Sequence, residues 1–211
     1  MKALHTQMNP HFISNCLNSI REMILNNENR EASHFLTQFA HLIRVTLDNS
    51  THSFISLHNA MDYLKRYVEM EQIRNSAFTC RISADAQLDI NEVFLPPMLI
   101  QPFVENAIWH GMAGDRKNIH VNINFKKQNN QLLCIIDDTG IGIEKSLENK
   151  KYSKNLHRSV AVANIKQQIQ LLNEKYNLKS SVTIEDKSKM AGFNETGTMV
   201  TLRLPIKIME T

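Results

Sequence analysis

The sequence predicts an α+β protein, with a helical N-terminal part followed by a domain in which strands and helices are mixed. Apolar residues recur at the helical period from about residue 4 to residue 75, a stretch without glycine, and they alternate at the two-residue period of strands after Asn75. The 211 residues are enough for two small domains with a core each. We therefore expect residues 1–75 and 76–211 to form separate domains.

Three amphipathic helices are predicted in the first part. Their apolar stripes run from Leu4 to Ile24, from Ala32 to Leu47 and from Leu57 to Val68, and Ser56 is a suitable N-cap for the third. These stripes cannot all be buried within one copy of the helices, whereas pairing with a second copy into a bundle would cover them. We expect a homodimer.

The second part is predicted to be a sandwich of helices on a sheet. Strands are expected at Phe78 to Ser83, Asn118 to Phe125, Leu132 to Ile136, Ser181 to Glu185 and Met199 to Leu204, and the second and third of these should form a hairpin around Gln128-Asn129-Asn130. Helical spacing predicts helices at Pro97 to His110 and at Ser159 to Tyr176, and Pro97 is suited to a first helical turn. The lysine-rich stretch from Glu144 to Arg158 has little periodicity and is expected to be a loop. This order of strands and helices predicts a sandwich in which helices pack on a sheet in two or three layers.

Composition excludes several classes of protein. A formal net charge of +3 is too small and too dispersed for a nucleic-acid-binding surface. The cysteines, Cys16, Cys80 and Cys134, are scattered and odd in number, which excludes a disulfide framework and a zinc site and favours the reducing cytoplasm. No apolar run approaches the roughly 18 residues of a membrane span. We expect any sensor and membrane segment to lie upstream of Met1.

The first candidate for chemistry is the segment Asn9-Pro10-His11-Phe12. Pro10 should begin or kink a helix, and His11 then lies on a polar flank beside the apolar stripe. A neutral imidazole is populated near pH 7, and its free nitrogen can attack phosphorus. The alternative is an ordinary surface histidine beside a proline.

The second candidate is the segment from Glu105 to Gly111, near the end of a predicted helix. Asn106 and His110 are four residues apart and project together. An amide oxygen suits a Mg²⁺ ion carried in with a nucleotide, and Glu105 can orient a water molecule or the metal. The alternative is a polar helix face that ends at a glycine cap.

Two further segments follow or precede predicted strands. Asp138-Thr139-Gly140-Ile141-Gly142 comes after an apolar strand, and an aspartate there can accept a hydrogen bond from an amino group such as that of adenine. The same letters also describe a simple turn. Gly197-Thr198 before the last strand is an equally weak signal when it is taken alone.

Together and in this order, these segments resemble the LytS-type sensor histidine kinases. Residues Gln7 to Ile20 read QMNPHFISNCLNSI, which is similar to the family's phosphoacceptor block, and Pro96 to Gly111 read PPMLIQPFVENAIWHG, which is similar to its ATP-side block. The resemblance covers nearly the whole chain. It implies a Bergerat-type ATP-binding domain, like that of the gyrase, chaperone and MutL group of ATPases, for residues 76–211. It also implies a dimerisation and histidine phosphotransfer region for residues 1–75.

The resemblance also implies a role for each candidate residue. His11 would accept a phosphoryl group from ATP and pass it to an aspartate of a response regulator, with Glu105 as a catalytic or metal-orienting carboxylate. Asn106 would bind Mg²⁺, and His110 would lie near the triphosphate. The adenine pocket would be formed by Asp138, Gly140, Gly142 and Thr198.

The chain departs from the family pattern at several positions. Ser14 replaces an aromatic residue, Thr139 replaces asparagine, and Phe12 stands where many histidine kinases have an acid, so the general base is not identified. The segment from Ser159 to Asn164 lacks the glycines expected for wrapping phosphate. These departures keep two alternatives open: an ATP-responsive dimeric interaction module without phosphate transfer, and an ATPase of the same superfamily without a phosphoacceptor.

Overall fold

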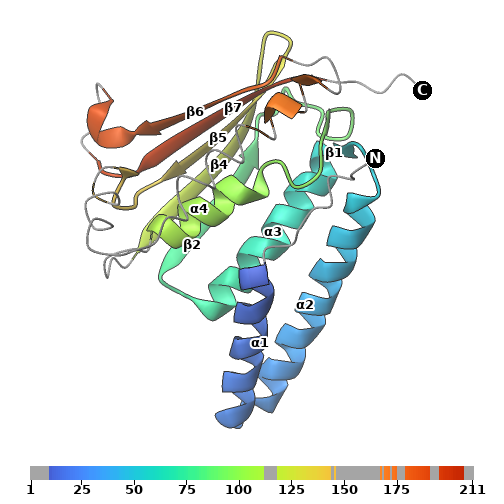
Figure 1. Cartoon of the computed structure of the whole chain (residues 1–211), viewed down its shortest axis with the longest axis vertical. Coiled ribbons are helices and arrows are strands. Elements are labelled where there is room, and N and C mark those ends of the chain that lie inside the picture. Colours follow the sequence, from blue (N-terminus) through green and yellow to red (C-terminus); the bar gives the residue numbers. More distant parts are fainter. Residues whose placement is uncertain are drawn as a thin grey trace.

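The computed structural model describes residues 10–111, 118–143, 145, 167, 169–171, 173–174, 179–190 and 195–206. The predicted loop from 144 to 158, apart from Lys145, and the glycine-poor segment from 159 to 164 lie outside these residues, as does most of the helix predicted from 159 to 176. The described part confirms an α+β architecture in which helices cover one face of a mixed sheet (Figure 1).

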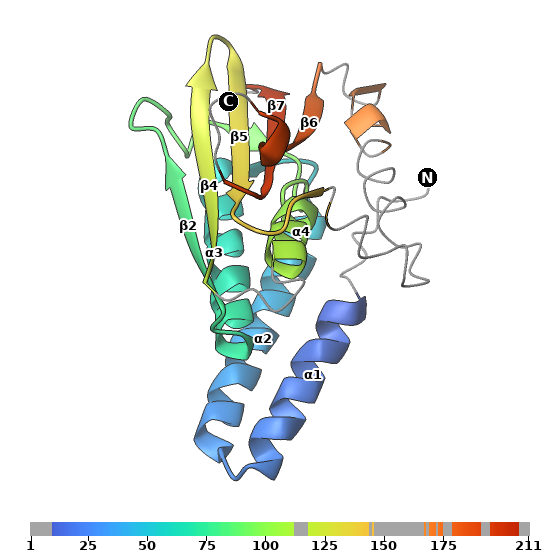
Figure 2. The same cartoon turned by 90° about the vertical axis from the view of Figure 1, so that its left-hand side faces the viewer.

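The three predicted N-terminal helices are present. They are α1 (Pro10–Leu25), α2 (Asn29–Ser50) and α3 (Leu57–Arg74), and α2 packs against both of the others. The Ser56 side chain accepts a hydrogen bond from Asn59 N at 3.2 Å, which confirms the predicted N-cap of α3. The α1–α2 hairpin extends away from the sheet, while α3 lies beside it (Figures 1 and 2).

The sheet has five strands in the order β2-β4-β5-β7-β6. They are β2 (Phe78–Ala84), β4 (Ile119–Gln128), β5 (Gln131–Asp138), β6 (Ser181–Asp186) and β7 (Thr198–Pro205). Only β2 and β4 are parallel, and the other neighbours are antiparallel. The predicted hairpin turn is confirmed, since Gln128 pairs with Gln131 and Asn129 adopts a left-handed φ of 53°.

The predicted start of the fourth helix at Pro97 is wrong. Helix α4 spans Gln101–Gly111, and the preceding residues form turns in which Met98 has a φ of 60°, outside the helical region. The carbonyl of Ile100 accepts the first helical hydrogen bonds, from Phe103 N at 3.1 Å and Val104 N at 3.3 Å. Just before these turns, β3 (Phe94–Leu95) pairs with β1 (Ile55–Ser56), a short ladder that the sequence did not predict.

The core lies between the helices and the inner face of the sheet. Strand β4 alternates buried and exposed residues from Ile119 to Phe125, as predicted, and α4 packs on β4 and β5. One continuous set of buried apolar side chains extends from Phe12 in α1 through α3 to Phe125 in β4. Among the described residues, no helix has the length and hydropathy needed to span a bilayer.

A very short connector joins α3 to β2. The helix ends at Arg74, and the strand begins at Phe78. Asn75 N donates to the carbonyl of Glu71 at 2.8 Å, and the Asn75 side chain accepts from Ala77 N at 2.9 Å. The connector is therefore held by its own hydrogen bonds as well as by its length.

Candidate functional site

Asp138 is the last residue of β5 and the best-defined member of the candidate site. Its side chain is buried, and Oδ1 accepts hydrogen bonds from Gly140 N at 2.8 Å and Thr198 N at 3.2 Å. Both of these bonds go to Oδ1, and the described residues place no further donor on Oδ2. The structure thus brings together three of the residues expected in the adenine pocket, Asp138, Gly140 and Thr198.

Gly197 precedes Thr198 and packs directly against the backbone of Asp138. A Cβ atom at this position would lie 1.9 Å from the Asp138 carbonyl oxygen, and the φ of 140° is one that other residues rarely adopt. Only glycine therefore allows β7 to begin close enough for Thr198 N to reach the Asp138 carboxylate. The weak Gly197-Thr198 signal in the sequence has this close approach as its physical basis.

Hydrogen bonds hold both sides of the turn after Asp138 in place. Thr139 N donates to the carbonyl of His120 at 3.1 Å, and Thr139 Oγ1 accepts from His120 N at 2.9 Å, so this threonine continues the pairing of β5 with β4. Gly142 has a φ of 80°, and Asp186 Oδ2 accepts from Ile143 N at 2.6 Å. The departure at Thr139 from the family's asparagine is therefore compatible with a well-held turn.

Burial changes the acidity of Asp138. Desolvation raises the pKa of its carboxyl from the usual 3.8 to about 6, against the lowering effects of the Gly140 and Thr198 N–H groups and of the Lys187 charge. Asp137 adds a smaller raising effect. The carboxylate is consequently ionised at neutral pH and becomes protonated in mildly acidic solution.

Helix α4 carries the other expected nucleotide-side residues. Glu105 and Asn106 are both partly exposed, and Glu105 Oε1 accepts from Gln101 Nε2 at 2.7 Å. His110 lies in the last turn of the same helix, but its side chain is outside the described part of the structure. Helix α4 packs on β5, the strand that ends at Asp138.

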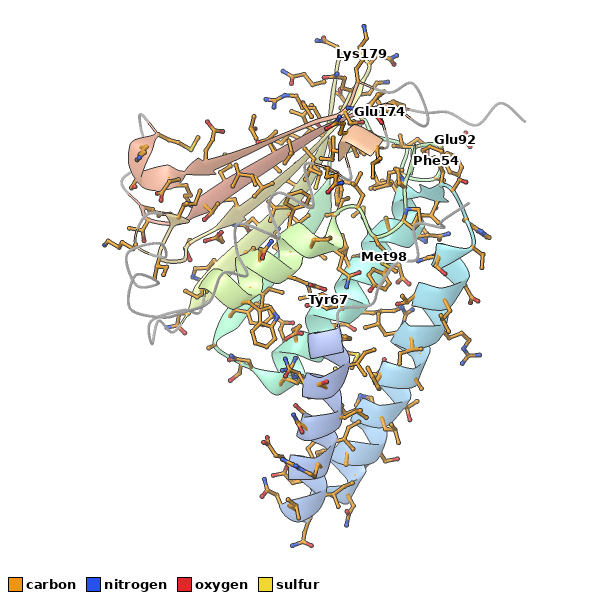
Figure 3. The ribbon with its side chains drawn as sticks, viewed as in Figure 1. Phe54, Tyr67, Glu92, Met98, Glu174 and Lys179 are labelled. Atoms are coloured by element: carbon orange, nitrogen blue, oxygen red, sulfur yellow. The ribbon has the colours of Figure 1, made fainter. Side chains whose placement is uncertain are left out.

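A buried polar cluster connects three helices. The Arg74 guanidinium donates to both Glu71 carboxylate oxygens at 3.0 Å and to Ser19 Oγ in α1 at 3.3 Å, and it lies 5.4 Å from the Trp109 ring centroid in α4. Glu71 is only 1% exposed, and desolvation raises its pKa despite the neighbouring Arg74. Tyr67 adds a hydrogen bond to Glu71 and lies where α1, α3 and α4 meet (Figure 3).

His11 lies in the first turn of α1, directly after Pro10, and its side chain is outside the described part. The next residue, Phe12, is buried, with its ring centroid 5.1 Å from that of Tyr67 and 6.2 Å from that of Phe39. Ser14 is exposed, so the loss of the family's aromatic residue there removes no core contact. The start of α1 is therefore anchored by Phe12.

Within the described residues, a magnesium ion would have to be held together with a nucleotide rather than by a protein cluster. The described residues contain no group of three or more His, Cys, Asp or Glu side chains that could hold a metal. Mg²⁺ often keeps most of its water ligands and is held by one or two protein oxygens together with substrate phosphates. The side-chain oxygen of Asn106 suits that mode.

Sequence reasoning missed three polar residues around Asp138. Asp137 and Lys187 form a salt bridge at 2.7 Å, and Asp186 holds the glycine turn through Ile143 N. A second aspartate next to Asp138 was the one visible signal. Nothing in the periodicity indicates that the lysine at 187 is buried.

Comparison with known proteins finds similarity to histidine kinases. Residues 1–78 match the family model described as histidine kinase. The Sensor protein LytS of Oceanobacillus iheyensis is 32% identical over 202 residues, which cover 92% of this chain and 34% of that protein. The Sensor histidine kinase/phosphatase LytS of Staphylococcus aureus strain Mu50 is 28% identical over 146 residues, which cover 69% of this chain and 25% of that protein.

A solved structure shares the fold. The histidine kinase domain of the blue-light activated histidine kinase EL346 of Erythrobacter litoralis aligns with a TM-score of 0.50 at 17% identity, over 81% of this chain and 74% of that one. Beyond the histidine kinase match of its first 78 residues, the chain is similar to the LytS-type sensor kinases over almost its whole length, although it spans only about a third of the Oceanobacillus relative.

Proposed function

We propose that this chain is the kinase core of a two-component sensor, which phosphorylates its own His11 from ATP and then passes the phosphoryl group to an aspartate of a response regulator. A ring nitrogen of His11 attacks the γ-phosphorus, the bond to the β-phosphate oxygen breaks, ADP leaves, and the imidazole proton goes to solvent. The nucleotide-binding capacity follows from the histidine kinase ATPase fold. The transfer to a partner rests on the resemblance to the LytS-type kinases.

The arrangement of Asp138 is the observation that carries this proposal. A buried carboxylate at the end of a strand and beside a glycine turn has one oxygen satisfied by two backbone N–H groups, and the other has no donor within the described part of the chain. Such an acceptor matches an exocyclic amino group like that of adenine and rejects a carbonyl oxygen at the same position. Adenine over guanine is the expected preference.

The other site residues take complementary roles in the proposal. Asn106 would hold Mg²⁺, which neutralises charge on the triphosphate. Glu105 would orient the metal or a water molecule, and His110 would lie near the phosphates. Residues 1–75 would serve dimerisation and phosphotransfer, and residues 76–211 would bind ATP. The free thiols of the three cysteines support a cytoplasmic location for this core.

The test is label incorporation from γ-labelled ATP and Mg²⁺, with Asp138→Asn as the pocket variant. We expect label on the wild type and a need for roughly tenfold to a hundredfold more ATP in the variant, the usual cost of one good polar contact. The asparagine amide can keep the bonds from Gly140 and Thr198 through its oxygen, but it then presents an N–H₂ donor to the adenine amino group.

The same experiment has a pH signature. Because the pKa of Asp138 is about 6, the wild-type affinity for ATP should be constant above about pH 7 and fall as the pH drops through 6, where the carboxylate gains a proton. Asp138→Asn should show no fall near pH 6. Wild-type chain that binds ATP but never acquires label would favour the alternative of a non-catalytic ATP-responsive module.

The proposal includes a homodimer, and the exposed apolar residues of the helical hairpin support it. On α1 these are Leu17, Ile24 and Leu25, at 54%, 52% and 73% exposure, and on α2 they are Leu36 and Leu47, at 50% and 60%. Leu17 and Ile24 are two helical turns apart on one face. A second copy would bury them as a bundle does.

Leu17→Glu combined with Ile24→Glu should convert the dimer into a monomer, because two charges would be buried in the interface. Sedimentation equilibrium gives the mass directly. Ile73→Glu on α3, where the isoleucine is 46% exposed, is the matched control and should leave the mass unchanged. A dimer that survives the double change would place the interface elsewhere.

A further inference from the structure

Lys187 is a buried lysine whose ammonium group lies against the end of β5. The residue is 1% exposed, and its Nζ atom is 2.7 Å from Asp137 Oδ1 and donates to the Asp138 carbonyl at 3.2 Å. A buried lysine is unfavourable in its charged form unless partners compensate its desolvation. Asp137 and the Asp138 carbonyl supply that compensation here.

The backbone fixes this charge in place. Lys187 begins the short 3₁₀ turn η1 (Lys187–Lys189) after β6, and its N–H donates to the carbonyl of Gly197 at 3.0 Å. Asp186 caps that turn by accepting from Ser188 N at 3.0 Å. Gly197 in turn presses on the Asp138 carbonyl, so the same peptide oxygen is contacted by Gly197 and by the Lys187 ammonium group.

Charge acts on Asp138 from several elements. Burial raises the pKa of the Asp138 carboxyl most, the Gly140 and Thr198 N–H groups and then the Lys187 charge lower it, and Asp137 adds a smaller raising effect. Glu195 lies 3.8 Å from the Lys187 ammonium but is 71% exposed, so solvent screens it. Among the described residues, the ionisable groups on the elements around Asp138 are His120 on β4, Asp137 on β5, Asp186 on β6, Lys187 on η1, Glu195 before β7 and Glu105 on α4, the helix that packs on β5.

We propose that Lys187 is a positioning residue for nucleotide recognition: its ammonium group holds the end of β5 in place and supplies the positive charge that keeps Asp138 a hydrogen-bond acceptor. The proposal rests on the proposed nucleotide-binding function. Two contacts carry it, the bond to the Asp138 carbonyl and the ion pair with Asp137. Lys187 does not touch the ligand in this scheme and acts through Asp138.

The test measures ADP affinity by calorimetry from pH 5 to pH 8.5 in the wild type, Lys187→Met and Lys187→Arg. Methionine keeps much of the length of the side chain without its charge. We expect the pH midpoint of ADP binding to move upward by about one unit in Lys187→Met, with an affinity about fivefold lower at the wild-type midpoint and about tenfold lower well below it. Lys187→Arg should stay close to the wild-type midpoint.

Asp137→Asn should shift the pH midpoint of ADP binding in the opposite direction. Asp137 is 25% exposed, so its replacement is tolerated more easily, and it removes the negative charge that both raises the pKa of Asp138 and neutralises Lys187. The midpoint should move downward. A general loosening of the pocket would lower the affinity by the same factor at every pH and would not move the midpoints in opposite directions.

A carboxyl ¹³C NMR titration of Asp138 without nucleotide gives a second, independent readout. Its midpoint should shift upward in Lys187→Met and downward in Asp137→Asn. If the wild type binds ADP but neither midpoint moves, the role of Lys187 is overturned while the proposed function stands. If the wild type binds no ADP at any pH, the proposed function and this role both fall.

Discussion

Replacing His11 by glutamine should abolish phosphoryl label completely while the chain still binds ATP. Glutamine keeps a polar side chain of similar length at the first turn of α1 but has no nucleophilic ring nitrogen. The wild-type label should be acid-labile and base-stable, as a phosphorus–nitrogen bond is. Filter binding after acid or alkali treatment measures this directly.

His34→Gln is the matched control for this experiment. His34 is exposed and helical, on α2, and none of the motifs includes it. Its variant should incorporate label at the wild-type rate. Label that persists on His11→Gln at the wild-type level would move the phosphoacceptor to another of the nine histidines.

Arg74→Met should destabilise the fold by about 3–5 kcal/mol, the usual cost of leaving a buried charge without its partner. The change removes the cation from Glu71, which is 1% exposed, and the contacts with Ser19 and Trp109. Urea unfolding at a fixed protein concentration measures the free energy. Adding Glu71→Gln to this variant should recover part of the loss, because the uncompensated charge is then gone.

Arg66→Met on the same helix is the control for Arg74→Met. Arg66 pairs with Asp62 at 2.8 Å, but the two side chains are 36% and 47% exposed. An exposed pair of this kind contributes about 0.2–1 kcal/mol. Equal losses in the two arginine variants would show that the cluster around Arg74 is not a buried ion pair in solution.

The sequence predicted the regular elements well because most of them bury one face. Apolar spacing located α2, α3 and the strands of the five-stranded sheet, and the Asn129 turn followed from its residues. The predicted start of α4 was wrong because Met98 has a left-handed backbone, which prevents the helix from beginning at Pro97. The β1–β3 ladder was missed because a strand of two residues has no period.

The candidate site was predictable in part. Asp138, Gly140 and Thr198 stand in motifs, and the structure brings them together through backbone hydrogen bonds. Lys187 was not predictable, because a lysine becomes buried only when tertiary partners such as Asp137 compensate its charge. The exposure of Ser14 likewise depends on where α2 packs, which local sequence does not specify.

The three-residue connector between α3 and β2 has a mechanical consequence. A fully extended chain of that length reaches about 10 Å at most, and the hydrogen bonds of Asn75 shorten it further. There is almost no slack, so a tilt or rotation of α3 is transmitted directly to the edge of the sheet. We therefore expect α3 and β2 to move together rather than independently.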